Sequence, residues 1–82
     1  MHLSVLTPGV EYFSGQITSI KVPGAAGQFQ VLKNHAPIVS ALVDGAVEVK
    51  TSEGKLMKFV IKGGFIEVLN NKVALLVQGI TE

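Results

Sequence analysis

Hydrophobic and polar residues alternate with a period of two along much of this chain. Val47 and Val49 alternate with Glu48 and Lys50, a pattern typical of a strand with one buried face and one face in water. Three other segments follow the same pattern, and their inward-pointing side chains are predicted to be Leu3 and Val5, Phe29 and Val31, and Met57, Phe59 and Ile61. The pattern therefore predicts short, half-buried β-strands.

Turn-forming residues separate these segments at intervals of about ten residues, which is the spacing of strands in a sandwich or barrel. The turn signals are Thr7-Pro8-Gly9, residues 23–27, Lys33-Asn34, Asp44-Gly45, Ser52-Glu53-Gly54, Gly63-Gly64 and Asn70-Asn71. No segment has the spacing of an amphipathic helix. We therefore predict a single all-β domain over residues 1–82, with about eight or nine short strands.

Two of these turns have a specific expected geometry. Asn70 and Asn71 suit a two-residue hairpin turn, because asparagine tolerates the positive φ that such turns need. Gly63 and Gly64 predict a bend or bulge at which the chain crosses between sheets. Pro37 stands at the start of a strand, where its missing N–H group does no harm.

Two runs of the sequence, residues 38–43 and 73–77, are apolar almost throughout, which is typical of strands covered on both faces. A two-layer sandwich covers one face of each strand, and no helix is predicted that could cover the other. A protein partner is the simplest cover; the alternative is that these are central strands whose outer side chains are small or partly exposed. The composition favours a partner, because 48% of the residues are hydrophobic and only 16% are charged, against about 25% charged in typical domains.

Charge, cysteine content and the N-terminal residues exclude several classes of protein. Seven basic and six acidic residues are interspersed without a run of one sign, so no nucleic-acid partner is expected. The absence of cysteine excludes disulfides, zinc–thiolate sites and thiol catalysis. The N-terminus lacks the regions of a signal peptide, and no apolar stretch approaches the roughly 18 to 20 residues of a membrane-spanning helix. We expect a soluble chain with no direct membrane insertion and no cofactor.

Some residues could carry chemistry, and each has a simpler structural explanation. His35 has only His2 as a second imidazole, and no carboxylates cluster near either, so a metal site is set aside. Ser40, His35 and Asp44 could suggest a hydrolase triad. However, Ser40 lies within an apolar strand instead of on a strained turn, and small sandwiches rarely offer a deep pocket.

A glycine-rich loop and a lysine leave further alternatives. The loop at residues 24–27 has the spacing of an RNA-binding GxxG loop, but it lacks flanking basic residues and a following helix, so a simple turn is predicted. Lys58 lies beside Met57, as the modified lysine of biotin and lipoate carrier domains does, although Lys58 is placed within a strand and not at a hairpin tip. A carrier domain and a generic β-sandwich adaptor remain the alternatives.

A set of motifs in fixed order resembles the N-terminal β-sandwich domain of the epsilon subunit of F-type ATP synthase. The motifs are residues 2–5, Phe13-Ser14-Gly15, residues 24–28, Asn34-His35-Ala36-Pro37, Asp44-Gly45 and residues 63–68, which together extend over nearly the whole chain. The resemblance implies a flattened sandwich of two sheets, with about ten short strands. It also implies a non-catalytic central-stalk subunit, monomeric when isolated and peripheral to the cytoplasmic face of the bacterial inner membrane.

The resemblance further implies two partners, the gamma subunit of F1 and the c-ring of Fo. His35-Ala36-Pro37 matches the family position at the boundary between gamma and the ring, Gln28 matches a loop residue facing the ring, and Thr7-Pro8 matches a turn near gamma. The expected partner-binding residues are Thr7, Pro8, Gln28, Lys33, Asn34, His35, Ala36, Pro37, Ile38, Ser40 and Leu42.

Two features depart from the pattern of the family. Many relatives carry acidic residues where this chain has Ala26-Gly27-Gln28, and a Pro-Gly pair where it has Lys33-Asn34. We therefore expect Gln28 and Lys33 to contact the ring through hydrogen bonds. The C-terminal helical pair of longer relatives is also missing, and the sequence leaves open whether the chain is naturally short. If the chain is naturally short, inhibition of ATP hydrolysis in the enzyme is expected to depend on another component.

Overall fold

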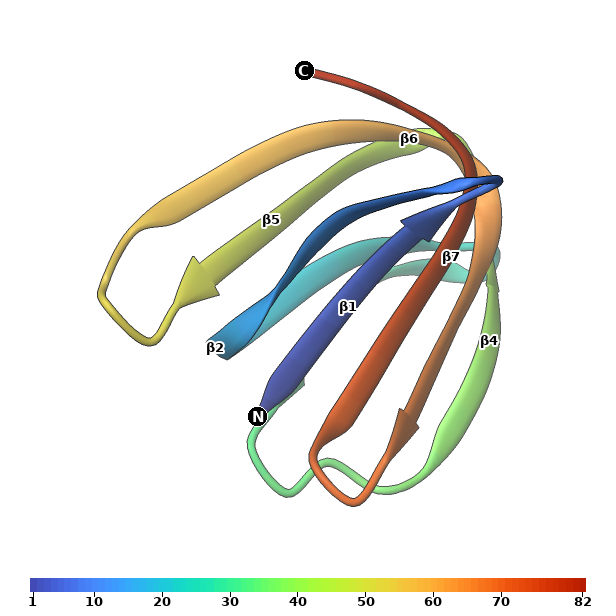
Figure 1. Cartoon of the computed structure of the whole chain (residues 1–82). Coiled ribbons are helices and arrows are strands. Elements are labelled where there is room, and N and C mark those ends of the chain that lie inside the picture. Colours follow the sequence, from blue (N-terminus) through green and yellow to red (C-terminus); the bar gives the residue numbers. More distant parts are fainter.

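The computed structural model describes residues 1–82 and contains seven strands and no helix, and therefore no helix that could span a membrane. The strands are β1 (His2–Thr7), β2 (Val10–Gly24), β3 (Gly27–Leu32), β4 (Ile38–Leu42), β5 (Gly45–Thr51), β6 (Leu56–Leu69) and β7 (Lys72–Thr81) (Figure 1). Each segment with period-two alternation forms part of one of these strands. The all-β prediction is confirmed.

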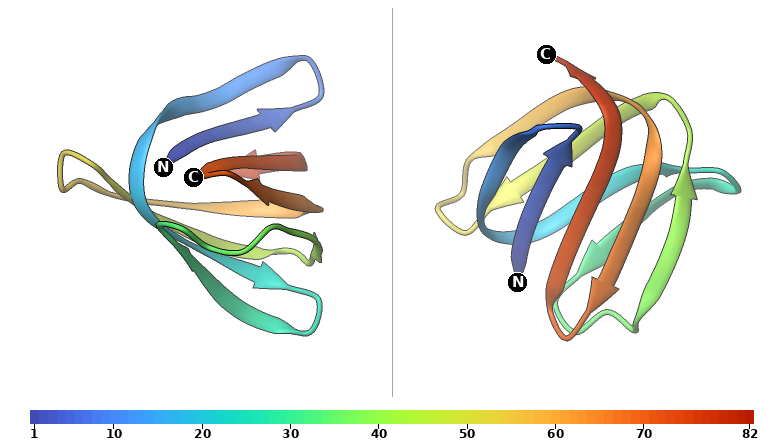
Figure 2. Two further views of the ribbon diagram at one scale, coloured as in Figure 1. Left: turned by 90° about the horizontal axis from the view of Figure 1, so that it is seen from below. Right: turned by 45° about the vertical axis from the view of Figure 1, so that its right-hand side comes forward.

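Two long strands, β2 and β6, take part in both layers of the sandwich. The first half of β2 pairs with β1, and the second half pairs with β5 and β3. The first half of β6 pairs with β5 and the second half with β4, while β7 follows β6 through both halves. Figure 2 shows β2 curving from the side of β1 to the side of β3. The expected eight to ten short strands are therefore seven, because two strands bend between the layers instead of ending in a turn.

In each long strand the buried residues switch between odd-numbered and even-numbered positions at one point. In β2 the pairing register with β5 shifts between Ile17 and Ser19, so the buried positions change from odd to even. In β6 the change occurs at Gly63 and Gly64, which have φ values of 46° and 129°. A Cβ atom on Gly64 would lie 2.8 Å from Cα of Val77 and closer still to a backbone oxygen, so only glycine fits there. The predicted crossing between sheets is confirmed.

The core between the two layers consists of 16 buried hydrophobic side chains, of which Phe59 is the largest. Residues predicted to point inward, such as Leu3, Val5, Val47 and Val49, are completely buried. Burial of each such side chain contributes roughly 1.5–3 kcal/mol to folding. No buried side-chain nitrogen or oxygen lacks a hydrogen-bond partner. The core is therefore apolar, and it leaves no buried polar side-chain atom without a hydrogen bond.

Most loops gather at two opposite ends of the sandwich, while the β5–β6 loop projects at the left of Figure 1. The Asn end, at the bottom of Figure 1, contains the N-terminus, the β6–β7 turn and the β3–β4 loop at residues 33–37. Asn70 and Asn71 form that turn with φ values of 49° and 59°, as predicted. The hairpin end contains the β1–β2 turn, the tip of the β2–β3 hairpin and the bend of β6. The Asn end therefore brings the β3–β4 loop and the β6–β7 turn together, whereas the hairpin end brings together the β1–β2 turn, the β2–β3 tip and the bend of β6.

Candidate partner-binding face

One outer surface of the sandwich is mainly apolar. It consists of the outward-pointing side chains of β1, β4, β7 and the second half of β6, and is called here the apolar face. The pairing registers place Ala41 opposite Phe65, Phe65 opposite Leu76, and Leu76 opposite Leu6. Four neighbouring strands therefore each contribute an apolar side chain to one continuous row.

The large side chains of this face are open to solvent in the isolated chain. Phe65 is 53% exposed and Leu76 is 37% exposed, while Val39 and Leu69, nearer the Asn end, are 70% and 57% exposed. A contiguous apolar surface of this kind is a mark of a protein-binding site. The outer side of β4 is uncovered in the isolated chain, and its cover by a partner stays a prediction.

Shallow hollows lie along the apolar face. One of about 400 Å³ lies at the hairpin end, between the β1–β2 turn and the side chains of Phe65 and Leu76. Another, of about 360 Å³, lies between β4 and β6 and is lined by Pro37, Val39 and Leu69. Such hollows could receive side chains of a partner, but they are too open to enclose a small molecule.

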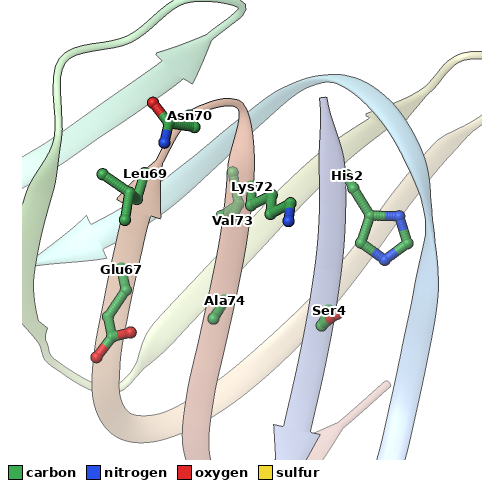
Figure 3. A pocket seen from close by; sticks show the side chains of 8 residues that line it. All are labelled: His2, Ser4, Glu67, Leu69, Asn70, Lys72, Val73 and Ala74. Carbon is green, nitrogen blue, oxygen red and sulfur yellow. The ribbon is translucent and has the colours of Figure 1, made fainter.

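The Asn end of the apolar face is more polar than the rest. A third hollow, of about 320 Å³, lies over β1, β7 and β6 and is lined by His2, Ser4, Lys72 and Glu67 among others (Figure 3). Lys72 extends from β7 toward β1, and the His2 ring lies 3.2 Å from the hydroxyl of Ser14. The apolar row is therefore bordered on this side by the ammonium group of Lys72, the carboxylate of Glu67 and the hydroxyl of Ser4.

The opposite outer surface, called here the charged face, has a different pattern. It consists of the outward-pointing side chains of β3, β5, the second half of β2 and the first half of β6. Glu48 lies between Lys21 and Lys58 in the pairing register, so charges of opposite sign neighbour one another. Leu56 and Val60 are exposed here too, but they face Lys50 and Ala46, so no large apolar residues are paired across strands.

The residues considered above for chemistry are not gathered at one place in the structure. No three His, Cys, Asp or Glu side chains lie close enough to hold a metal ion. His35 Nδ1 lies 2.7 Å from the carbonyl oxygen of Ala36, and the Ser40 hydroxyl donates to the carbonyl of Ala41, so no hydrogen bond connects these two residues. Lys58 lies within β6, opposite Glu48, and not at the tip of a hairpin.

The residues expected to bind partners divide between the two ends and the core. Thr7 and Pro8 border the hollow at the hairpin end. Lys33, Asn34, His35, Ala36 and Pro37 form the β3–β4 loop at the Asn end. On β4 the even-numbered positions point inward, so Leu42 lies in the core at 6% exposure, and Ile38 and Ser40 are half-buried. Val39 and Ala41 are the outward residues of β4, and the choice of Ile38, Ser40 and Leu42 as partner contacts stays a prediction.

Gln28 and Lys33 do not lie together. Gln28 pairs with Pro23 near the tip of the β2–β3 hairpin, whereas Lys33 follows the other end of β3. Five residue steps of a strand separate them by about 17 Å. One flat partner surface at either end could therefore contact only one of the two side chains directly.

Sequence reasoning did not select Leu6, Phe65, Leu69 and Leu76, although they dominate the apolar face. A signal for them exists, because residues 65–69 and 73–77 carry apolar side chains at both odd and even positions. What the sequence lacks is the pairing register that brings Phe65, Leu76 and Leu6 side by side.

The fold is a small β-sandwich domain with a contiguous apolar outer face. Comparison with known proteins identifies the group within this class. The chain belongs to the family described as ATP synthase, delta/epsilon chain, beta-sandwich domain, which matches residues 1–82.

Individual relatives agree with this assignment. The ATP synthase epsilon chain of Chlorobium limicola is 42% identical over 79 residues, which cover 96% of this chain and 90% of the relative. The epsilon chain of Leptospira borgpetersenii is 41% identical, but only 59% of its length is matched. A chain in the mitochondrial ATP synthase of Euglena gracilis has the same fold, with a TM-score of 0.87 at 24% identity over 96% of this chain and 51% of that one. A chain in the Tetrahymena thermophila enzyme, from a structure of its central stalk and c-ring, gives a TM-score of 0.85 at 18% identity, over the whole of this chain and 66% of that one.

Proposed function

We propose that this chain is a non-catalytic subunit of the central stalk of a rotary ATP synthase, which binds the gamma subunit through the apolar face. The observation that carries this proposal is the continuous row of Leu6, Leu76, Phe65 and Ala41 across four strands. A joint that transmits torque needs a large, well-packed contact. Exposed ion pairs are a poor substitute, because each contributes only about 0–1 kcal/mol.

The second part of the proposal assigns the c-ring to the hairpin end. The tip of the β2–β3 hairpin is exposed at Ala25, Ala26 and Gln28, and its polar group is the Gln28 amide. In the resemblance to epsilon subunits, Gln28 occupies the ring-facing position. Lys33, at the other end of β3, then lies at the gamma side and does not contact the ring.

Through these contacts the chain would couple rotation of the ring to rotation of gamma, and it would catalyse no reaction itself. The chain links the rotating gamma subunit to the ring, so that rotation driven by ion flow is transmitted toward the catalytic sites of F1. It is peripheral to the membrane, at the cytoplasmic face of the bacterial inner membrane, and monomeric until it meets gamma. Support for this role comes from the epsilon-chain relatives and from the apolar face.

The gamma contact can be tested with the isolated chain and the gamma subunit of the same enzyme. Native mass spectrometry should give a one-to-one complex. Hydrogen exchange in that complex should fall in β1, β4, β7 and the second half of β6, and remain unchanged in β3 and β5. Two free monomers, or protection centred on β3 and β5, would refute this placement of gamma.

The ring contact can be tested by cross-linking, because the chain contains no native cysteine. A photoactivatable cross-linker on Ala26→Cys should capture the c subunit in the assembled enzyme. The same reagent on Lys33→Cys, which is equally exposed but lies at the Asn end, serves as the matched control and should not. Cross-linking of the ring from position 33 and not from position 26 would reverse the proposed orientation.

A further inference from the structure

Two asparagines from distant parts of the sequence form a reciprocal pair at the Asn end. The backbone N–H of Asn34 donates to Oδ1 of Asn71 at 2.7 Å, and Nδ2 of Asn71 donates to Oδ1 of Asn34 at 3.0 Å. The backbone carbonyl of Asn71 also accepts from the N–H of His2 at 2.9 Å. Asn71 thus links the β3–β4 loop, the β6–β7 turn and the start of β1.

Both members of the pair have a left-handed backbone. Their φ values are 67° for Asn34 and 59° for Asn71. Asparagine is among the few residues other than glycine that adopt this region readily. Either residue can therefore be replaced by glycine with no steric penalty, so the amide groups can be removed while the turns are kept.

The loop held by this pair borders the apolar face. Within the loop, the N–H of His35 donates to the carbonyl of Leu32 at 3.1 Å. Pro37 then lines the hollow between β4 and β6, next to Val39 and Leu69. The Asn34–Asn71 pair is the one side-chain connection between this loop and the turn that ends β6.

We propose that Asn71 is a positioning residue of the partner-binding surface, which acts by holding the β3–β4 loop against the β6–β7 turn before the partner arrives. A loop that is already ordered loses less conformational entropy on binding, so the complex is tighter than with a free loop. This inference rests on the proposed contact with gamma and adds to it a residue that need not touch gamma itself.

The test compares three variants of the full chain. Asn71→Gly removes both side-chain hydrogen bonds but keeps the turn. Asn70→Gly makes the same chemical change one position earlier, at a residue that also has positive φ but takes no part in the pair. Asn71→Asp keeps the acceptor for the Asn34 N–H, and the Asn34 amide can turn to donate to the second carboxylate oxygen.

Two quantities are measured for each variant. Amide exchange at Asn34, followed by NMR in the free chain, reports whether the pair exists in solution. Titration calorimetry with the gamma subunit of the same enzyme gives Kd. Asn71→Gly should accelerate exchange at Asn34 by about ten-fold and weaken gamma binding by about three- to ten-fold. Asn70→Gly should match the original chain in the exchange rate at Asn34 and in Kd. Asn71→Asp should recover most of the affinity for gamma.

The urea midpoint of Asn71→Gly should fall only by the small amount that the loss of two exposed hydrogen bonds produces. The variant therefore stays fully folded in the titration, and weaker binding reports positioning and not unfolding. The inference is overturned if exchange at Asn34 is unchanged in Asn71→Gly, because the pair then does not form in solution. Faster exchange with an unaltered Kd would also overturn it, while leaving the proposed function intact. If the original chain itself fails to bind gamma, the proposed function and the role of Asn71 both fall.

Discussion

The two outer faces of the sandwich expose similar kinds of residue in different arrangements. Each face has large apolar side chains in contact with water, for example Phe65 on one and Leu56 on the other. On the apolar face such residues are direct neighbours across the strands, whereas on the charged face Leu56 lies opposite Lys50. The two faces therefore differ in cross-strand register, and not in whether they expose large hydrophobic residues.

The same strand contributes to both faces. The first half of β6 has Lys58 and Val60 outward, and the second half has Phe65 and Leu69 outward. Between them, Gly63 and Gly64 change the set of inward positions from odd to even. This change lets one 14-residue strand present a charged surface in one layer and an apolar surface in the other.

The largest expected effect comes from a change at the bend itself. In Gly64→Ala the new Cβ would collide with the backbone of β7, which cannot move without losing its pairing with β6 and β1. We expect a loss of about 3 kcal/mol or more in the free energy of unfolding, measured by urea denaturation. Gly79→Ala is the control, because its Cβ would be 3.9 Å from the nearest atom. Equal stability of the two variants would contradict this account of the bend.

The next effect separates the two faces directly. Phe65 and Val60 both lie on β6, at 53% and 47% exposure, but on different faces. Phe65→Asp places a charge in the middle of the apolar row and should weaken gamma binding by at least about 2 kcal/mol. Val60→Asp should leave the affinity unchanged at a similar small cost in stability. The measurement is calorimetric titration with gamma, and an equal loss in both variants would remove the distinction between the faces.

Features of the fold that depend on neighbouring residues could be predicted from the sequence, whereas features that depend on pairing between distant strands could not. Period-two alternation correctly identified inward residues such as Val47, Val49 and Phe59, because alternation is a local property of a strand. Asn70 and Asn71 also gave the right turn, since positive φ depends on the residue itself.

Features that depend on pairing between distant strands were not accessible in this way. The shift at Ile17 and Ser19 interrupts the alternation of β2. The strand continues through it because β5 pairs with residues on both sides of the shift, and β3 pairs with β2 from Ser19 onward. The residues of β4 are apolar apart from Ser40, so the sequence gave no sign that the odd-numbered positions, Val39 and Ala41, point outward. The Asn34–Asn71 pair joins residues 37 positions apart and has no local signal.

A smaller effect is expected on the charged face. Glu48→Lys places three positive charges side by side with Lys21 and Lys58, across β2, β5 and β6. Like charges directly opposite each other should lower the free energy of unfolding by roughly 0.2–1 kcal/mol, and added salt should restore part of it. Affinity for gamma should not change. A loss of gamma binding in this variant, at full stability, would show that the charged face also carries a contact.

The smallest effect concerns the end of β7, where that strand has passed into the layer of the charged face. Tyr12 packs on Phe59 with ring centroids 5.1 Å apart. The pKa of Tyr12 is raised above its ordinary value of 10.0, mainly by burial and further by a hydrogen bond to Glu82 and the negative charge of Glu82. Because the unfolded chain then loses this proton at lower pH than the folded chain, the stabilisation is complete below about pH 10 and is lost as the pH rises through the raised pKa. The free energy of unfolding of the original chain should therefore fall more steeply above pH 10 than that of Tyr12→Phe, which lacks the phenolic proton. Parallel curves for the two proteins would mean that Tyr12 is not held against Phe59 and Glu82 in solution, and that the end of β7 is free of β2.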